Sequence, residues 1–200
     1  MKKTAIIISA LMILMLLCSC TYAKQSQQGC FKIMYGSFLP IIPNADGVCV
    51  CSYTWDGNEE NMEIVIPDKY NSHDIKKLGG YYGRGVPAPF TIDDTSWMNP
   101  ADGSGMTPNG ITVSYDMLFD HSVEYSEIVY HDFDLYIGNS VDGITGNPVV
   151  TVYTVDGVKT AYCPRVTAYC DADNETFYAY DGKLYYREND QLVDEFIYAD

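Results

Sequence analysis

The sequence contains few cations, few histidines and only one long apolar run. Lys and Arg number 12 and His 3, against 27 Asp and Glu, so the formal net charge is −15 over 200 residues. A field of this sign repels phosphate backbones and anionic lipid surfaces. We therefore expect no nucleic acid partner and no membrane attachment through a basic patch. The apolar run, residues 5–17, is shorter than the ~20 residues with which a mature helix spans a bilayer.

Helical periodicity is scarce as well. The one candidate helix covers residues 190–198, a segment that fits a last strand equally well. By contrast, 18 tyrosines stand among Val, Ile, Thr and Phe, residue types that suit the pleated, half-buried surface of a sheet. Hydrophobic residues make up 47% and charged residues 20%, as in an ordinary globular protein. We expect a mainly β fold, an antiparallel sandwich or meander with Asp-Gly hairpins and little helix.

The clearest local signals are two hairpins. Residues 152–162 turn at Asp156-Gly157, and residues 177–186 turn at Asp181-Gly182. A two-residue type I′ turn needs positive φ at both central positions, which Gly adopts freely and Asp tolerates. Further strands are expected over residues 47–55, 62–66, 110–118 and 126–137. In the last of these, alternation predicts an inner face with Phe133 and Leu135 and a wetter outer face with Asp132 and Asp134.

The composition also suggests how the chain is divided. Residues 1–19 have the pattern of a signal peptide, and residues 20–29 are polar and predict a short tether. Residues 30–200 are long enough for one well-buried β-rich domain. Prolines and glycines gather in the middle of the chain, so a boundary near residues 91–110 stays open.

The N-terminus carries the strongest single motif. Two lysines precede the apolar run, which ends in Leu17-Cys18-Ser19-Cys20. This ending resembles the lipobox of bacterial lipoproteins, which implies cleavage before Cys20 and a diacylglycerol on its sulfur. The protein would then be exported and held by lipid to the outer face of the cytoplasmic membrane or cell envelope, with a net charge of −17 after two lysines are lost. Free secretion after cleavage before Lys24, and an uncleaved anchor, are the alternatives.

Five cysteines follow Cys20. Cys163 and Cys170 flank six residues and would close a local disulfide if their strands face each other. Cys30 would pair with Cys49 or Cys51, and such bonds persist outside the cytoplasm. Zinc is disfavoured, because Cys49 and Cys51 have one residue between them where structural sites have two to four.

Residues 63–79 (EIVIPDKYNSHDIKKLG) resemble one unit of a BspA-like leucine-rich repeat. The resemblance implies that Ile64 and Ile66 point inward, that Pro67 ends their strand, that Ile75 and Leu78 pack beneath, and that Gly79 makes the bend. Residues 80–90 depart from the family's continuation, and one unit cannot cover its own apolar face, so a solenoid is excluded. What the resemblance implies is a surface protein with a binding role and no catalytic residues.

Patterns for catalysis and for cofactors are weak. The glycine-rich run 79–85, which contains Arg84, lacks the Gly-Lys-Ser/Thr of a phosphate loop, so no nucleotide is expected. His121 and His131 would form a metal site with neighbouring Asp132 and Asp134 only in a favourable strand register. Solvated histidines on a sheet face are the preferred interpretation.

Calcium is the better metal hypothesis, although no cofactor is firmly indicated. Asp171, Asp173 and Glu175 place carboxylates at alternate positions on an expected turn. An EF-hand loop beginning there would need Gly in place of Thr176 and Glu in place of Gly182, so any such site is non-standard.

Tyrosines form the remaining candidate. Tyr178, Tyr180, Tyr185 and Tyr186 gather on one hairpin, and tyrosine suits protein and sugar surfaces alike. These residues, with Arg84, form the candidate ligand surface. We expect a non-catalytic role in binding a protein or a glycan at the bacterial cell surface.

Two alternatives stay open: an envelope or wall-associated enzyme acting on glycan through a carboxylate pair, and an accessory subunit of an envelope complex. A buried carboxylate pair in a cleft would favour the enzyme. An exposed tyrosine stripe rimmed by acids would favour binding, and a flat apolar patch would favour the complex.

Overall fold

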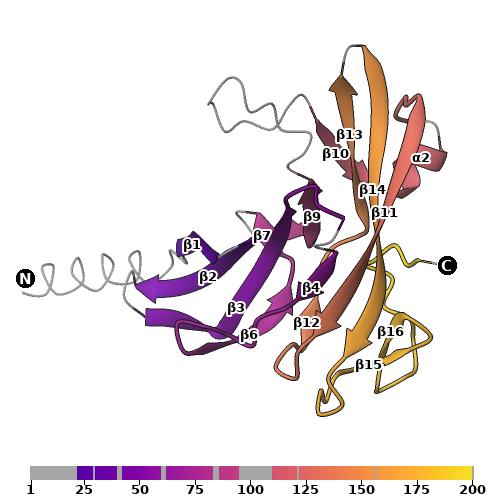
Figure 1. Cartoon of the computed structure of the whole chain (residues 1–200). Helices are drawn as coiled ribbons and strands as arrows, with labels where there is room; N and C mark the ends of the chain where they lie inside the picture. The colour runs from indigo at the N-terminus through magenta and orange to yellow at the C-terminus, as the bar shows by residue number, and fades with distance from the viewer. Residues whose placement is uncertain are drawn as a thin grey trace, which may run out of the picture.

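The computed structural model describes residues 22–28, 30–39, 42–59, 62–82, 86–94, 110–120, 122–155 and 157–199. Over these ranges the fold is mainly β, built on two sheets that lie side by side in Figure 1. The first sheet has the order β1 (Tyr22–Gln28), β2 (Phe31–Leu39), β3 (Ile42–Trp55), β6 (His73–Leu78), β12 (Gly143–Ile144), with β5 (Lys69–Tyr70) beside β6 and β9 (Thr91–Asp94) beside β3.

The second sheet has the order β10 (Ile111–Ser114), β13 (Val149–Val155), β14 (Val158–Cys170), β11 (Glu127–Ile137), β4 (Glu63–Val65). Two hairpins form separate two-stranded sheets: β7 (Gly80–Tyr82) with β8 (Val86–Ala88), and β15 (Phe177–Tyr180) with β16 (Lys183–Tyr186). The helix α2 (Asp116–Phe119) is a single turn.

The β-rich prediction is confirmed, but the sheets are mixed and not purely antiparallel. β3 runs parallel to β6 and β9, and β11 runs parallel to β14 and β4. The reason is that the chain repeatedly crosses between the two sheets. β4 joins the second sheet and the next long strand, β6, joins the first, so strands that return to one sheet can run in the same direction.

Both predicted hairpins form. The last residue pair before the turn is Val155 with Val158 in the hairpin of β13 and β14, and Tyr180 with Lys183 in the hairpin of β15 and β16. Each loop therefore has two residues. In the second loop Asp181 and Gly182 both have positive φ, 49° and 71°, as a type I′ turn requires. The hairpins belong to different sheets and do not form one meander.

Three expectations about local structure are wrong. Most of the expected tether is strand β1, whose seven residues pair with β2. The polar sequence of this segment has no alternation of apolar residues, so it did not indicate a strand. A strand at the edge of a sheet can nevertheless pair through its backbone alone. Residues 190–198 form turns and isolated bridges, neither a helix nor a strand. The strand expected over 110–118 ends at Ser114, where α2 follows.

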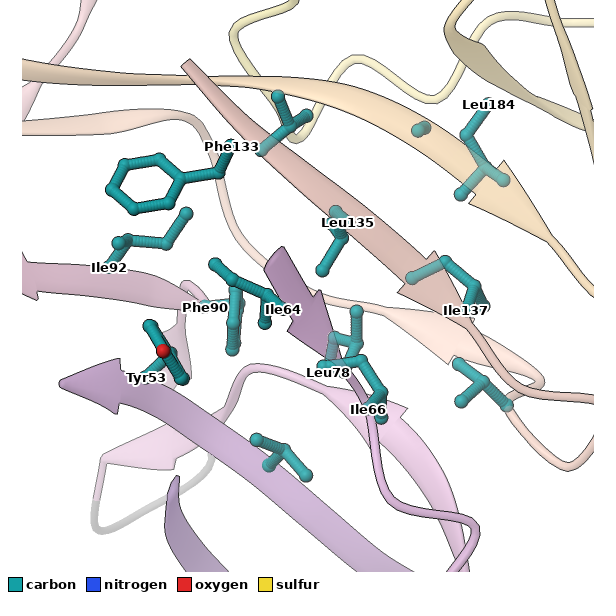
Figure 2. Packing of buried hydrophobic residues seen from close by; sticks show 14 of the residues in the cluster. Tyr53, Ile64, Ile66, Leu78, Phe90, Ile92, Phe133, Leu135, Ile137 and Leu184 are labelled. Atoms are coloured by element: carbon teal, nitrogen blue, oxygen red, sulfur yellow. The ribbon is translucent and has the colours of Figure 1, made fainter. Parts of the chain in front are cut away.

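The main core cluster lies between the sheets and the C-terminal hairpin (Figure 2). β11 contributes Phe133, Leu135 and Ile137, each at most 1% exposed, while Asp132 and Asp134 on the same strand are exposed. The predicted inner and outer faces of this strand are therefore confirmed. The cluster draws residues from both sides of the stretch 91–110, of which residues 95–109 lie outside the described ranges.

The apolar residues of the repeat-like segment, residues 63–79, are buried as expected. Ile64, Ile66, Ile75 and Leu78 are at most 2% exposed, and Gly79 has φ 78°. Only glycine fits at position 79, because a Cβ there would lie 2.6 Å from the carbonyl oxygen of Thr145. The four apolar side chains come from two different sheets, since β4 and β6 are separated by the core. The family resemblance itself stays a prediction.

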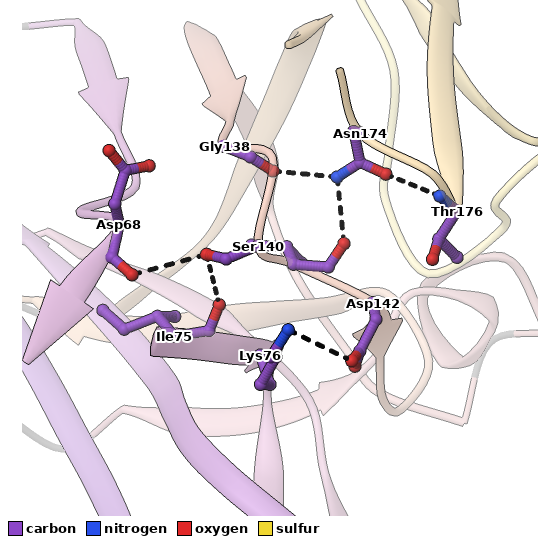
Figure 3. Close-up of polar contacts among 9 residues, drawn as sticks. Asp68, Ile75, Lys76, Gly138, Ser140, Asp142, Asn174 and Thr176 are labelled. Atoms are coloured by element: carbon purple, nitrogen blue, oxygen red, sulfur yellow. Dashed lines mark hydrogen bonds and ion pairs between the residues drawn. The ribbon is translucent and has the colours of Figure 1, made fainter. Parts of the chain in front are cut away.

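A buried amide joins the loops at one end of the second sheet (Figure 3). Asn174, 1% exposed, donates through Nδ2 to the carbonyl oxygens of Gly138 and Val141 at 2.8 and 2.9 Å. Its Oδ1 accepts the backbone N–H groups of Thr176 and Phe177 at 2.9 and 2.7 Å. All four hydrogen-bonding positions of the amide are thus used, so the loop after β11 and the entry to β15 are held to each other.

Next to this amide, Ser140 ties the same loop to the first sheet. Its hydroxyl oxygen lies 3.3 Å from the carbonyl oxygen of Asp68 and 2.9 Å from that of Ile75 (Figure 3). Lys76 and Asp142 form an ion pair at 3.9 Å close by. The loop from 138 to 142 therefore connects the two sheets through polar contacts as well as through the chain.

We predict that Asn174→Ala destabilises the protein by about 3–4 kcal/mol, because two carbonyls and two amides would lose a buried partner. Urea unfolding followed by circular dichroism measures the change. Asn139→Ala is the matched control, since Asn139 is exposed in the same loop and should change stability by less than about 0.5 kcal/mol. Equal effects of the two substitutions would contradict the proposed role of Asn174.

Candidate functional site

The outer face of the second sheet carries tyrosines beside carboxylates. In the register of β4, β11 and β14, Glu63, Asp134 and Thr167 form one row, and Val65, Tyr136 and Tyr169 form the next. Residues directly opposite in neighbouring strands point to the same face and contact each other. We call these six residues the tyrosine–acid face.

The two tyrosines of this face are stacked. The ring centroids of Tyr136 and Tyr169 are 4.6 Å apart, with 12° between the ring planes. Tyr169 is 40% exposed and Val65 is 54% exposed, so the row presents apolar surface to solvent. Desolvation, and then the charges of Glu63 and Asp134, raise the pKa of Tyr136. The phenol therefore stays neutral and keeps a hydroxyl that can donate to a ligand.

A cation on the neighbouring row of β14, Arg165, is already engaged within the protein. Arg165, one row further along β14, donates through Nε and Nη2 to the two carboxylate oxygens of Asp132 at 2.6 and 2.8 Å. Its guanidinium also lies 4.8 Å from the ring centroid of Tyr130. Because Arg165 neutralises Asp132, the negative charge left on the neighbouring rows comes from Glu63 and Asp134.

The tyrosines predicted to form the ligand surface divide between two faces of their hairpin. Tyr178 and Tyr185 stack at 5.4 Å on the outer face, where the Tyr178 hydroxyl donates to Asp190 at 3.0 Å. Tyr180 is 70% exposed at the turn. Tyr186 points the other way, packing on Phe177 at the edge of the core. Arg84 lies outside the described residues.

The acidic turn at 171–175 is held by hydrogen bonds within the protein. Asp171 accepts the N–H of Asp173 at 2.8 Å, as in an Asx turn. Arg187 donates to the carbonyl oxygens of Asn174 and Ala172 at 2.7 and 3.3 Å. Within the described residues no group of three His, Cys, Asp or Glu could hold a metal ion. Calcium on Asp171, Asp173 and Glu175 stays a prediction.

The cysteines do not form the expected local disulfide. Cys163 and Cys170 lie on one continuous strand, β14, so their Cα atoms are about 23 Å apart, far beyond the ~7 Å limit for a disulfide. Burial raises the pKa of Cys163 to about 12 and those of Cys51 and Cys170 to about 11. These three thiols are therefore protonated at neutral pH and are poor nucleophiles. Cys20 lies outside the described residues.

His131, expected on a solvated face, is half-buried against aromatic rings. The ring of His131 contacts Trp55 and Tyr162 edge-on, at centroid distances of 4.7 and 5.4 Å. It points to the opposite side of β11 from Asp132 and Asp134, so the three do not form a site. His121 lies outside the described residues.

One carboxylate pair does occur near a cavity. Asp194 and Glu195 share a side-chain hydrogen bond, and burial raises the pKa of Glu195. Oε2 of Glu195 is buried with no hydrogen-bond partner in the described structure, and the residue lines a cavity of about 30 Å³, room for one water. Hydrogen-bonded carboxyls are closer than the ~5 Å or more that glycosidases require. This pair therefore lacks the geometry expected of the glycan enzyme.

Comparison with known proteins yields little. No known protein family and no curated protein matches the chain. Among solved structures it is similar to the crystal structure of the pneumococcal vaccine antigen PcpA, at 13% identity and a TM-score of 0.20. The match covers 87% of this chain and 56% of that protein, so the chain spans about half of its length. A likeness of this size establishes neither a shared fold nor a function. Among the described residues, no helix is long and apolar enough to cross a membrane.

Sequence reasoning missed Tyr136 as a site residue. Its pairing with Tyr169 depends on the parallel register of β11 and β14, which no local pattern reveals. The available signal was the alternation in β11, which assigns Tyr136 to the same outer face as Asp134.

We predict that Glu195→Gln raises the melting temperature at pH 7 by about 2 °C. Because burial raises the carboxyl pKa, the folded protein binds the proton more tightly than the unfolded chain, so its stability falls as pH rises through that pKa. Gln removes this loss. The melting temperatures of wild type and Glu195→Gln should therefore become equal below pH 4.5, the ordinary carboxyl pKa. Glu59→Gln is an exposed control with the same change in charge. The difference between its melting temperature and that of wild type should not depend on pH in this way. A melting-temperature difference that is independent of pH would contradict this account.

Proposed function

We propose that the protein is a non-catalytic binding protein of the bacterial cell surface, and that its tyrosine–acid face binds a basic polypeptide segment. The observation that carries the proposal is the stacked pair formed by half-buried Tyr136 and exposed Tyr169 beside Glu63 and Asp134. Tyrosine is enriched in protein interfaces, and carboxylates beside aromatic rings suit Lys and Arg through ion pairs and cation–π contacts. The net charge of −15 would draw such a partner from a distance.

A glycan is the weaker candidate for this face. Sugars also stack on aromatic rings, but small-ligand sites are concave and bring a few polar groups together around the ligand. Here the two rows lie on the outside of a sheet, and Val65 stands 54% exposed among them. A broad face with an apolar centre and acidic neighbours fits an extended polypeptide better.

The anchor in this proposal is a lipid on Cys20. Strand β1 begins at Tyr22, so a lipid on Cys20 would leave almost no spacer between the membrane and the first sheet. The domain would then be displayed close to the lipid surface, and its acidity would keep its faces from adhering to anionic headgroups.

To test the anchor, cells producing the full chain are fed an alkyne-tagged fatty acid and the protein is partitioned between detergent and aqueous phases. We expect wild type and Cys18→Ala to be labelled and to enter the detergent phase. Cys20→Ala should be unlabelled and should lose the cleavage before residue 20. A wild-type protein found unlabelled in the medium would instead support free secretion with cleavage before Lys24.

To test the face, the purified protein is presented to two immobilised peptides, one of alternating lysine and valine and one of alternating glutamate and valine. We expect binding to the basic peptide alone, weakened by added salt. Tyr136→Ala and Tyr169→Ala should each weaken it about tenfold, because each removes half of the stacked pair.

Tyr180→Ala is the matched control, since Tyr180 is the most exposed tyrosine of the C-terminal hairpin and is not one of the six residues of the face. Its affinity should equal that of wild type. Glu63→Lys with Asp134→Lys should slow association and reduce the salt dependence. Equal binding of the two peptides, or equal effects of the Tyr136 and Tyr180 substitutions, would overturn the proposal.

A further inference from the structure

Three sulfur-containing side chains gather on the first sheet, on the opposite side of β3 from the core. Met34 in β2 lies directly opposite Cys49 in β3, and Cys51 follows two residues later. Opposite residues in an antiparallel pair have Cβ atoms about 4.5–5.5 Å apart and point to the same face. Val48 and Val50, which alternate with the cysteines, are buried in the core at 1% and 0% exposure. The cysteines therefore point away from the core.

A glycine leaves room beside these sulfurs. A Cβ on Gly80, the first residue of β7, would lie 3.2 Å from Sγ of Cys51 and 3.5 Å from Sδ of Met34. Both sulfurs thus border the same small space, and they are no further apart than the sum of these two distances. Any side chain at position 80 would fill this space.

A β-bulge directs Cys51 toward this space. Ile33 pairs with Val50 and Lys32 pairs with Ser52, so Cys51 is the extra residue of β3. Bulges re-aim a side chain and interrupt the ladder locally. Here the bulge brings Cys51 to the same point as Met34, whereas both its neighbours, Val50 and Ser52, are buried.

We propose that Cys49, Cys51 and Met34 bind one soft monovalent metal ion, Cu(I), through three sulfur atoms. Thiolate and thioether ligands select Cu(I), whereas structural zinc requires four ligands in a tetrahedron. Within the described residues no cluster of three His, Cys, Asp or Glu would supply a zinc or hard-metal set. Binding of Cu(I) releases the two thiol protons and leaves a complex with one net negative charge. Lys77, opposite Cys49 in β6, and Lys32, two residues from Met34, lie near enough to balance that charge.

The proposal is tested on the full chain carrying Cys18→Ser and Cys20→Ser, which removes the two N-terminal thiols. The protein is titrated with Cu(I) under anaerobic conditions in competition with a coloured Cu(I) chelator. We expect one Cu(I) per chain and X-ray absorption showing sulfur ligands alone. Cys49→Ser and Cys51→Ser should each abolish retention against the chelator, and Met34→Leu, which keeps the shape of the side chain, should weaken it at least tenfold.

Cys30→Ser and Cys170→Ser are the controls, and both should bind as the parent does. Circular dichroism of every variant separates loss of ligand from loss of fold. Gly80→Ala gives an independent readout, because its methyl group would occupy the space between the sulfurs and reduce affinity with all three sulfurs present. The proposal is overturned if the parent holds no Cu(I), if Cys51→Ser holds it unchanged, or if Zn(II) is held as tightly.

Discussion

The side chain of Asn174 is the contact on which the arrangement of the second sheet most depends. Its amide is buried and fully hydrogen-bonded, to Gly138 and Val141 on one side and to Thr176 and Phe177 on the other. A buried amide with only some of its partners would cost more than an apolar side chain there, so the four bonds are kept or lost together. They fix the loop that leaves β11 against the segment that enters β15, and the ladder bond from Asp171 to Ile137 continues β14 beside them.

This constraint bears directly on the tyrosine–acid face. Tyr136 and Tyr169 stand just before the ends of β11 and β14, where an unsupported sheet would fray. The loops held by Asn174 begin immediately beyond them, and Arg187 closes the second loop by donating to Ala172 and Asn174. A partner therefore meets a face that is already ordered, which reduces the conformational entropy lost on binding.

The sequence was informative where structure is decided locally and uninformative where it is decided by distant pairing. The turn at Asp181-Gly182 follows from the φ preferences of two residues, and the burial of Phe133 and Leu135 follows from alternation. The parallel pairing of β11 with β14 is set by how the chain crosses between sheets, so the stacking of Tyr136 on Tyr169 had no local signature. The contact of Arg187 with the turn at 171–175 had no local signature either, because Arg187 follows the hairpin of β15 and β16 and reaches back to the carbonyl oxygens of Ala172 and Asn174.

The distribution of charge links the fold to the proposed function. The chain has only 12 Lys and Arg, and those that the structure pairs are used internally: Lys69 with Asp74, Lys76 with Asp142, Lys159 with Glu124, Arg165 with Asp132, and Arg187 with loop carbonyls. Each of the four ion pairs joins two strands or loops, so it neutralises an acid at a junction between elements. Among the described residues, Glu63 and Asp134 beside Tyr136 belong to no such ion pair. Unpaired carboxylates therefore remain on the tyrosine–acid face, and a partner supplying Lys or Arg would form there the kind of ion pair that the protein makes within itself.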